Sequence, residues 1–229
     1  MDNIGKENGI LQYEFDQYAL ECKSALDLAM VRIENARRMI VADPLMHDPF
    51  DRIEGRIKTF DSMVRKCNRK KYPLDIEGIK ENVKDVAGIR IITIFRDEIY
   101  QVADLIAKIP GMNVVSREDY IKNPKKNGYS SLHLDVRVEI YSPGEGSKLV
   151  PIEIQIRDKS MNMWASVEHV VKYKKNNHDP QAEDYFKQMA EILLKFDEMA
   201  IRLRDYDEVA NTNESSTKTG SLTKVATIL

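Results

Sequence analysis

One short segment, Val150–Arg157, combines a strand pattern with side chains that could do chemistry. Its branched apolar residues alternate strictly with Glu153, Gln155 and Arg157, and this period of two predicts a strand buried on one face. The other face then carries a carboxylate, an amide and a guanidinium in one row, about 6–7 Å apart. Such a row could hold a metal ion and an anionic substrate. Taken alone, however, the segment is more simply a solvated antiparallel strand.

A second carboxylate, Asp85, stands at the start of an apolar run that ends at Phe95. The run predicts a central strand buried on both faces, in which Asp85 and Arg90 would be costly to desolvate unless they were paired. A structural salt bridge would satisfy both residues. The alternative is that Asp85 and Glu153, on two strands of one sheet, form a site for a hard cation such as Mg²⁺.

Basic residues are concentrated between residues 52 and 71, a segment that contains eight lysines and arginines but only two acidic residues. The segment predicts a short extended piece followed by a basic helix, and such helices are more often solvated faces than polyanion sites. Gly55 ahead of Arg56 and Lys58 is more suggestive. Glycine permits close approach of the backbone to a phosphate, so these three residues favour a polyanion site more than the basic helix does.

The segment Asp119–Ser131 is rich in lysine, asparagine, proline and glycine, a composition that predicts a loop. Its aromatic residue Tyr129 could stack on a nucleobase while the neighbouring lysines bind the phosphates. Taken alone, such a loop is more often an ordinary surface turn.

Composition describes a charged globular protein with one sizeable core, and a net charge of −2 provides no global basic field for nucleic acid. Cys22 and Cys67 lie far apart and form no disulfide or metal pattern, as is typical of a reducing cytosol. The N-terminus is too polar for a signal peptide, and no apolar run reaches membrane length. These features predict a cytoplasmic protein with no membrane partner.

Hydrophobic periodicity predicts an α+β (mixed α/β) fold, a mixed sheet of about five strands flanked by helices. Helical extensions are expected at both ends, over residues 13–41 and 180–209. Residues 1–12 are predicted to be an N-terminal arm and residues 13–209 a single domain. Residues 210–229 are so poor in apolar side chains that a disordered tail is expected.

Five segments in this order resemble one family, the RelA/SpoT-type (p)ppGpp synthetases. They lie within residues 50–175 and are Gly55–Lys58, Asp85–Arg90, Asp119–His133, Ile152–Arg157 and Met161–His169. Because the chain has no room for the hydrolase and regulatory regions of long members, it is expected to resemble the small alarmone synthetases. The resemblance implies a nucleotidyltransferase-like fold. It also implies transfer of pyrophosphate from ATP to the ribose 3′-hydroxyl of GTP or GDP, with release of AMP.

The resemblance also implies roles for the residues that bind ATP and the metal. Asp85 and Glu153 would hold Mg²⁺, and Glu153 would also accept the proton of the 3′-hydroxyl. Planar guanidinium groups suit stacking, so the adenine would lie between two arginines. The implied ATP-binding residues are Arg56, Lys58, Lys66 and Arg90.

The acceptor nucleotide, GTP or GDP, would be bound by residues of the loop and of the two strands that follow it. Tyr129 would stack on the guanine, Lys125 would neutralise phosphate charge, and Arg157 would close the site by pairing with a carboxylate. The implied acceptor-binding residues are Lys125, Asn127, Tyr129, His133 and Gln155.

Two departures from the family pattern stand out. Asp158 follows Arg157 where members commonly have threonine, and this adds a negative charge beside the site. Arg52 and Glu54 replace the phenylalanine and threonine that precede Gly-Arg in product-activated members. Activation by the product is therefore not predicted.

Two other functions share the same features. A catalytically inactive nucleotide- or RNA-binding module would use the basic residues but would have no use for Asp85 and Glu153 together. A polymerase-like nucleotidyltransferase usually has two carboxylates close together on one strand, and neither strand here has such a pair. The resemblance further implies a homotetramer. Binding of single-stranded RNA is not predicted.

Overall fold

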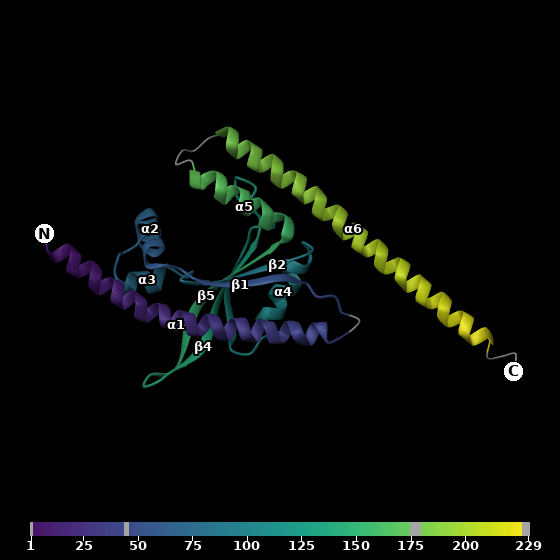
Figure 1. The fold of residues 1–229 in the computed structure, drawn as a ribbon, viewed down its shortest axis with the longest axis horizontal. Helices are drawn as coiled ribbons and strands as arrows, with labels where there is room; N and C mark the ends of the chain where they lie inside the picture. Colours follow the sequence, from purple (N-terminus) through teal and green to yellow (C-terminus); the bar gives the residue numbers. More distant parts are fainter. Residues whose placement is uncertain (1, 44–45, 175–179, 226–229) are drawn as a thin grey trace.

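The computed structural model describes residues 2–43, 46–174 and 180–225. It contains a mixed five-stranded sheet flanked by helices, so the predicted α+β architecture is confirmed (Figure 1). The strands are β1 (Phe50–Ile57), β2 (Ala87–Thr93), β3 (Met112–Asp119), β4 (Leu132–Ser142) and β5 (Gly146–Asp158). The helices are α1 (Asp2–Val41), α2 (Phe60–Lys70), α3 (Ile76–Asn82), α4 (Glu98–Ala107), α5 (Lys159–Lys174) and α6 (Pro180–Val225).

The strand order is β1-β2-β5-β4-β3, with β2 and β5 parallel and the other neighbours antiparallel. The parallel pair sets Gly88 beside Glu153 and Arg90 beside Gln155. Strand β1 then places Arg56 opposite Gly88. Because alternate side chains share a face, the polar residues of the three strands gather on one face of the sheet.

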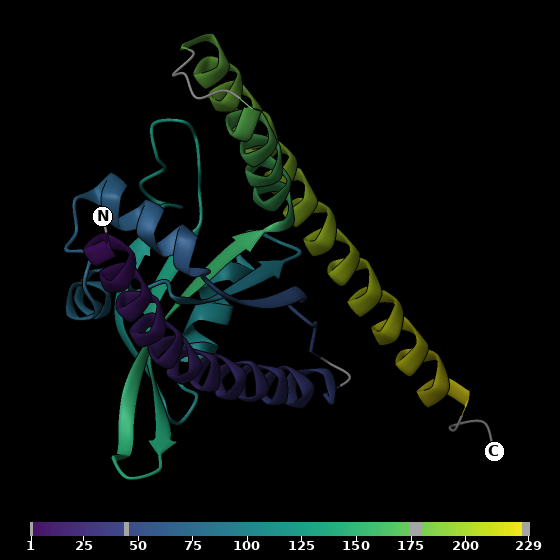
Figure 2. The same cartoon turned by 60° about the vertical axis from the view of Figure 1, so that its left-hand side comes forward.

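The other face of the sheet is the main core. Helix α1 lies across it, as both views of the chain show (Figures 1 and 2), and it packs on β1, β2, β4 and β5. The isoleucines of the predicted Val150–Arg157 strand, Ile152, Ile154 and Ile156, are buried in this core. The predicted one-sided burial of that strand is therefore confirmed.

Two expectations for the second strand were wrong in detail. Asp85 lies in a turn ahead of β2 rather than in the strand. Gly88 and Arg90 are only partly buried, because the first half of β2 has its polar face open. The apolar run was interpreted as a strand buried on both faces because it contains few polar residues. A glycine and a single arginine were enough to form the open face.

The two terminal helices are longer than the sequence predicts. Helix α1 begins at Asp2, within the predicted N-terminal arm, and α6 runs on to Val225 through residues predicted to be a disordered tail. Residues 226–229 of that tail lie outside the described part. A helix satisfies its own backbone hydrogen bonds, so a polar composition without proline does not by itself end it. The division of the chain into arm, domain and tail stays a prediction.

A second, smaller core joins α5 and α6 to the loop that precedes β4. It consists of Met161, Trp164, Phe186 and Leu193, with Tyr129 packed against it. The Trp164 indole donates a hydrogen bond to the backbone carbonyl of Phe186 at 2.9 Å. Gly128 has a φ of +88°, and a Cβ there would lie 2.6 Å from the Cβ of Ala190. Only glycine fits there, so α6 sets the position of the loop that carries Tyr129.

A buried acidic pair also ties α6 to the end of β5. Asp158 and Asp197 are only 1% and 5% exposed, and the hydroxyl of Ser160 lies 2.7 and 2.8 Å from one oxygen of each. A hydroxyl has a single proton to donate, so the second contact requires a proton on one carboxyl group. Arg96 lies 3.4 Å from Asp158 and 3.8 Å from Asp197. Burial and the charge of Asp158 raise the pKa of Asp197 to about 6.

Replacement of Asp197 by asparagine is expected to change the pH dependence of stability. Folding raises the pKa of this carboxyl from 3.8 to about 6. Its contribution to stability is therefore complete below pH 3.8 and is lost as the pH rises through 6. A shift of about two pKa units corresponds to roughly 2–3 kcal/mol. Urea unfolding across this pH range should show Asp197→Asn gaining stability relative to the wild type as the pH rises. Asp184→Asn, at an exposed position of α6, is the control, and parallel curves for Asp197→Asn and wild type would contradict the assignment.

Candidate active site

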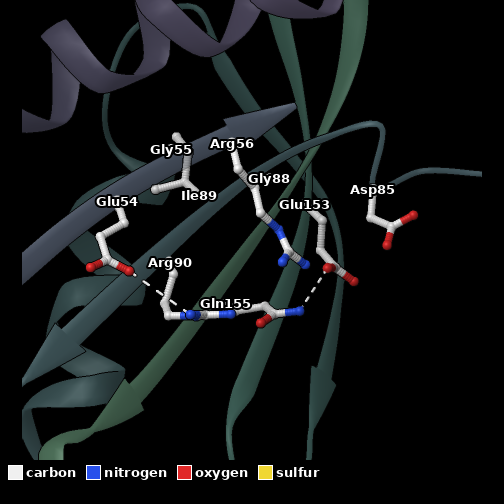
Figure 3. Close-up of a pocket in the computed structure, with 9 residues that line it drawn as sticks. All are labelled: Glu54, Gly55, Arg56, Asp85, Gly88, Ile89, Arg90, Glu153 and Gln155. Atoms are coloured by element: carbon white, nitrogen blue, oxygen red, sulfur yellow. Dashed lines mark hydrogen bonds and ion pairs between the residues drawn. The ribbon is translucent and has the colours of Figure 1, made fainter. Parts of the chain in front are cut away.

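The open face of β1, β2 and β5 holds a cavity of about 340 Å³ (Figure 3). Five of its lining residues were predicted from the sequence to bind the donor, the metal or the acceptor. The lining residues are Glu54, Gly55, Arg56, Asp85, Gly88, Ile89, Arg90, Glu153 and Gln155. The sheet register therefore brings together side chains that are up to about a hundred residues apart in the sequence.

Gly88 leaves the centre of this cavity open. It lies between Arg56 on β1 and Glu153 on β5, its two register partners. A Cβ added at Gly88 would meet only the backbone oxygen of Glu153, at 3.8 Å. Any larger side chain there would project into the space between the arginine and the carboxylate. Gly88 lies within the Asp85–Arg90 motif, but no role for it was predicted from the sequence.

Asp85 is held by two lysines from neighbouring elements. Its carboxylate lies 2.9 Å from the Lys58 ammonium and 2.7 Å from that of Lys66. Burial by itself would raise the pKa of Asp85, but the hydrogen bonds from Lys66 and Lys58 outweigh burial and lower the pKa. Asp85 is therefore ionised at neutral pH, and both predicted ATP-binding lysines are its partners.

Glu153 has one polar partner on each oxygen. Its Oε1 lies 3.4 Å from Nδ1 of His133, and its Oε2 accepts a hydrogen bond of 2.9 Å from the Gln155 amide. Burial would raise the pKa of Glu153, but His133 and Gln155 together lower it. Two ionised carboxylates thus lie on the same side of one cavity (Figure 3).

The two predicted adenine-stacking arginines enter this cavity from adjacent strands. Arg90 lies 3.8 Å from Glu54, its register partner on β1. The Nε of Arg90 is buried and has no hydrogen-bond partner in the described part of the chain. Glu54, which the sequence analysis noted only as a departure from the family pattern, therefore contacts a predicted ATP-binding residue.

A second cavity, of about 760 Å³, adjoins the first and shares Arg56 and Arg90 with it. It reaches Tyr129, Arg157 and the first turns of α5. Arg157 is 4% exposed, and its guanidinium lies 5.8 Å from the centre of the Tyr129 ring. The expectation that Arg157 pairs with a carboxylate is wrong for this structure: the hydrogen bond that the structure shows for it goes to the amide oxygen of Gln155, at 3.0 Å.

The carboxylate of Asp158 does not add charge to the cavity, contrary to expectation. Adjacent residues of a strand point to opposite faces, so Asp158 lies away from Arg157. It accepts hydrogen bonds from the backbone of Met161 and from Arg96 instead. Its role is to begin α5 and to bind α6.

The predicted acceptor loop is organised around Lys125. Its ammonium lies 4.3 Å from the ring centre of Tyr120 and 4.9 Å from that of Tyr129, which is a cation–π arrangement with two rings. Asn127 donates to Glu168 of α5 and accepts from the backbone of Tyr129, so it fixes the loop. Tyr120 was not predicted as a site residue, although a second aromatic residue in a lysine-rich loop is a usable signal.

The two carboxylates fit Mg²⁺ only in combination with a nucleotide. No group of three or more His, Cys, Asp or Glu side chains that could hold a metal ion occurs among the described residues. Mg²⁺ commonly takes one or two protein carboxylates and completes its shell with substrate phosphates and water. Asp85 and Glu153, in one cavity and with two lysines beside Asp85, meet that requirement.

Comparison with known proteins identifies the family. Residues 55–178 match the family model described as the region found in RelA/SpoT proteins. The chain is 35% identical to the GTP pyrophosphokinase YwaC of Bacillus subtilis, over 86% of this chain and 90% of that protein. It is 31% identical to the GTP pyrophosphokinase YjbM of the same organism, over 91% and 97%. The chain belongs to the RelA/SpoT family.

Solved structures extend this relationship to the fold. The small alarmone synthetase 1 of Bacillus subtilis bound to pppGpp has a TM-score of 0.76 at 30% identity, covering 84% of this chain and 97% of that one. The small alarmone synthetase 2 of that organism gives 0.75 at 33% identity, covering 84% and 99%. Within the described residues, no helix is long and apolar enough to cross a membrane.

Filling the centre of the cavity should prevent nucleotide binding without unfolding the protein. Gly88→Val places a branched side chain in open space on a strand, where valine is well tolerated. We expect affinity for a non-hydrolysable ATP analogue to fall at least ~10-fold, about 1.4 kcal/mol, while the melting temperature changes by only about 2–4 °C. Gly88→Ala, which adds a single methyl group, should have a smaller effect. Calorimetric titration measures both variants, and unchanged affinity in Gly88→Val would exclude this cavity as the donor site.

Proposed function

We propose that the protein is a GTP pyrophosphokinase, which transfers the β,γ-pyrophosphate of ATP to the ribose 3′-hydroxyl of GTP or GDP. The products are AMP and the alarmone (p)ppGpp. One observation carries the proposal: two ionised carboxylates, Asp85 and Glu153, share a cavity with Arg56 and Arg90. Two lysines contact the Asp85 carboxylate. Similarity to two GTP pyrophosphokinases along nearly the whole chain supports this reading.

The donor site that we infer lies between β1 and β2. The guanidinium groups of Arg56 and Arg90 are suited to stacking on the two faces of adenine. The Lys58 and Lys66 ammonium groups, which hold Asp85 in the free protein, are close enough to meet the phosphates of ATP. A homologous small alarmone synthetase 1 has been solved with AMPCPP, an ATP analogue, which supports a donor nucleotide in this fold.

The acceptor site that we infer lies along the larger cavity, toward Tyr129. The ring of Tyr129 offers a stacking surface for guanine. Lys125 lies over that ring in the free protein and would exchange this contact for acceptor phosphates. Gln155 and His133 border Glu153, so the ribose would lie next to the carboxylate.

Positioning and electrostatics supply most of the rate in such a transfer. The 3′-oxygen forms a bond to the β-phosphorus of ATP, and the bond from that phosphorus to the α,β-bridging oxygen breaks. Glu153 takes the hydroxyl proton, and the bridging oxygen leaves with AMP. Mg²⁺ held by Asp85 and Glu153 would neutralise charge on the phosphates. ATP and GTP are cytoplasmic metabolites, and we therefore expect the protein to act in the cytoplasm.

Loss of the Glu153 carboxylate should abolish turnover rather than weaken substrate binding. We expect Glu153→Gln to lower kcat roughly 10²–10⁴-fold, because glutamine can neither accept the proton nor hold the metal. The assay incubates the protein with Mg²⁺, labelled ATP and each of GDP, GTP and GMP, and then separates the nucleotides. A guanosine product with matching AMP release would establish the activity and identify the acceptor. Glu139→Gln, an exposed glutamate on β4, is the matched control. Near-normal turnover of Glu153→Gln, or release of pyrophosphate instead of AMP, would contradict the proposal.

We also propose that copies of this chain associate through α6. An exposed apolar stripe runs along this helix at alternating spacings of four and three residues, the pattern of a coiled-coil seam. Its members are between 58% and 75% exposed and comprise Ile192, Phe196, Met199, Leu203 and Tyr206. Helix α6 also extends well beyond the sheet, where a second copy can reach it (Figures 1 and 2). Exposed stripes of this kind usually mark interaction sites.

Charges placed in this stripe should lower the oligomeric state. We expect Phe196→Glu combined with Leu203→Glu to shift the molar mass to that of a monomer, as measured by light scattering after gel filtration. Tyr141→Glu, at an equally exposed aromatic residue of the β4–β5 hairpin, is the control and should leave the mass unchanged. A wild-type monomer at micromolar concentration would rule the association out.

A further inference from the structure

We infer that His133 is a positioning residue that acts on the reaction through Glu153, and that Tyr129 holds it in the required tautomer. The inference rests on the proposed function, in which Glu153 accepts the proton of the acceptor hydroxyl. It changes the role that the family resemblance implied for His133, which was direct binding of the acceptor. It also connects the acceptor-stacking ring to the proton acceptor through two contacts, one on each nitrogen of the His133 ring.

The geometry consists of two contacts on the two ring nitrogens. Nδ1 of His133 lies 3.4 Å from Oε1 of Glu153. Nε2 of the same ring lies 3.1 Å from the hydroxyl oxygen of Tyr129. The ring is also fixed from the side, because Tyr120 meets it edge-on at 5.2 Å between centroids. The imidazole therefore lies between a carboxylate and a phenol in a defined orientation.

The chemistry of these partners selects one tautomer. A carboxylate only accepts hydrogen bonds, so the nitrogen that faces Glu153 must carry a proton. In a neutral imidazole the other nitrogen then has a lone pair and accepts, so the Tyr129 hydroxyl is the donor. The direction of donation thus runs from Tyr129 to His133 to Glu153. This Nδ1-protonated form differs from the Nε2-protonated form that free neutral histidine prefers.

The second oxygen of Glu153 is fixed in the same manner from the opposite side. Gln155 donates to Oε2, and its own amide oxygen accepts from Arg157, which determines which way the amide is turned. Both ends of the carboxylate are therefore oriented by side chains that are themselves oriented. Such support matters because misplacement of a catalytic group by about 1 Å can cost about 10²-fold in rate.

The link to Tyr129 gives this arrangement a specific consequence. If guanine stacks on the Tyr129 ring, Tyr129 contacts the acceptor nucleotide and also holds His133. His133 in turn orients Glu153, which accepts the proton. The ring and the hydroxyl of Tyr129 then have separable effects. The ring should determine the acceptor KM, and the hydroxyl should affect kcat.

Substitutions that mimic one nitrogen at a time test the inference. The amide NH₂ of asparagine lies close to the position of Nδ1, whereas that of glutamine lies close to Nε2. We expect His133→Ala to lower kcat roughly 10–100-fold, as loss of an orienting partner typically does, with the acceptor KM changed less than about threefold. His133→Asn should recover most of kcat, and His133→Gln should behave like His133→Ala. Rescue by glutamine rather than asparagine, or a raised acceptor KM with normal kcat, would overturn the inference.

The Tyr129 pair is the matched comparison. Tyr129→Phe keeps the stacking ring and removes the donor, so we expect a lower kcat with an unchanged acceptor KM. Tyr129→Ala should raise the acceptor KM as well. If Tyr129→Phe retained full kcat, the hydroxyl would have no part in positioning His133.

A measurement that needs no turnover separates this inference from the proposed function. Nitrogen-15 chemical shifts of the histidine rings distinguish the two neutral tautomers, and the signal of His133 is the one lost in His133→Ala. We expect the Nδ1-protonated tautomer in the wild type and a return to the Nε2-protonated form in Glu153→Ala. If the protein made no pyrophosphorylated product, the proposed function would fail. The tautomer would still show whether Nδ1 of His133 donates to Glu153. An Nε2-protonated His133 in the wild type would overturn the inference by itself.

Discussion

The site depends on keeping two carboxylates ionised in a partly buried cavity. Desolvation opposes their charge, so each carboxylate needs partners that favour the ionised form. Asp85 has the ammonium groups of Lys58 and Lys66, and Glu153 has His133 and Gln155. These partners come from α2, β4, β5 and the residue that follows β1, so the site requires several elements of the fold to be in place. Phosphates that bring their own negative charge can compete for the same lysines, so the free protein already contains the electrostatic complement of a nucleotide.

The parallel pairing of β2 with β5 provides this arrangement. It places Gly88 and Arg90 beside Glu153 and Gln155, and β1 and β4 then add their polar residues to the same face. Since side chains alternate, a slip of one residue would bury Glu153 in the core and expose the isoleucines. Packing of Ile152, Ile154 and Ile156 under α1 therefore fixes the register of the chemical groups as well as the stability of the fold.

Much of this could be predicted from local patterns, and the exceptions have physical reasons. Alternation in Val150–Arg157 predicted β5 and its open face, because a strand buried on one face has apolar side chains at every second residue. The half-open β2 could not be recognised, since a strand is open or buried according to what packs on it, and Gly88 has no side chain to signal a cavity. The pairing of Asp158 with Asp197 joins residues from two helices and a strand end, and no local pattern reports such a contact. Some site residues were predicted only through the resemblance to a family. Their spacing alone favoured ordinary charged residues exposed to solvent.

Helix α6 takes part in three features of the structure that lie far apart in the sequence: the acceptor loop, the end of β5 and the exposed apolar stripe. One part of it packs against the acceptor loop, where Ala190 lies on Gly128 and the carbonyl of Phe186 accepts from Trp164. Asp197, one turn further on from Leu193, accepts a hydrogen bond from Ser160 in the first turn of α5, directly after the end of β5. The outward side of the same helix carries the exposed apolar stripe. If copies of the chain associate through this stripe, α6 would contact another subunit on one side and the Tyr129 loop on the other, and a change at either contact could reach the other. Association and acceptor binding would therefore be thermodynamically linked, because both depend on the position of α6.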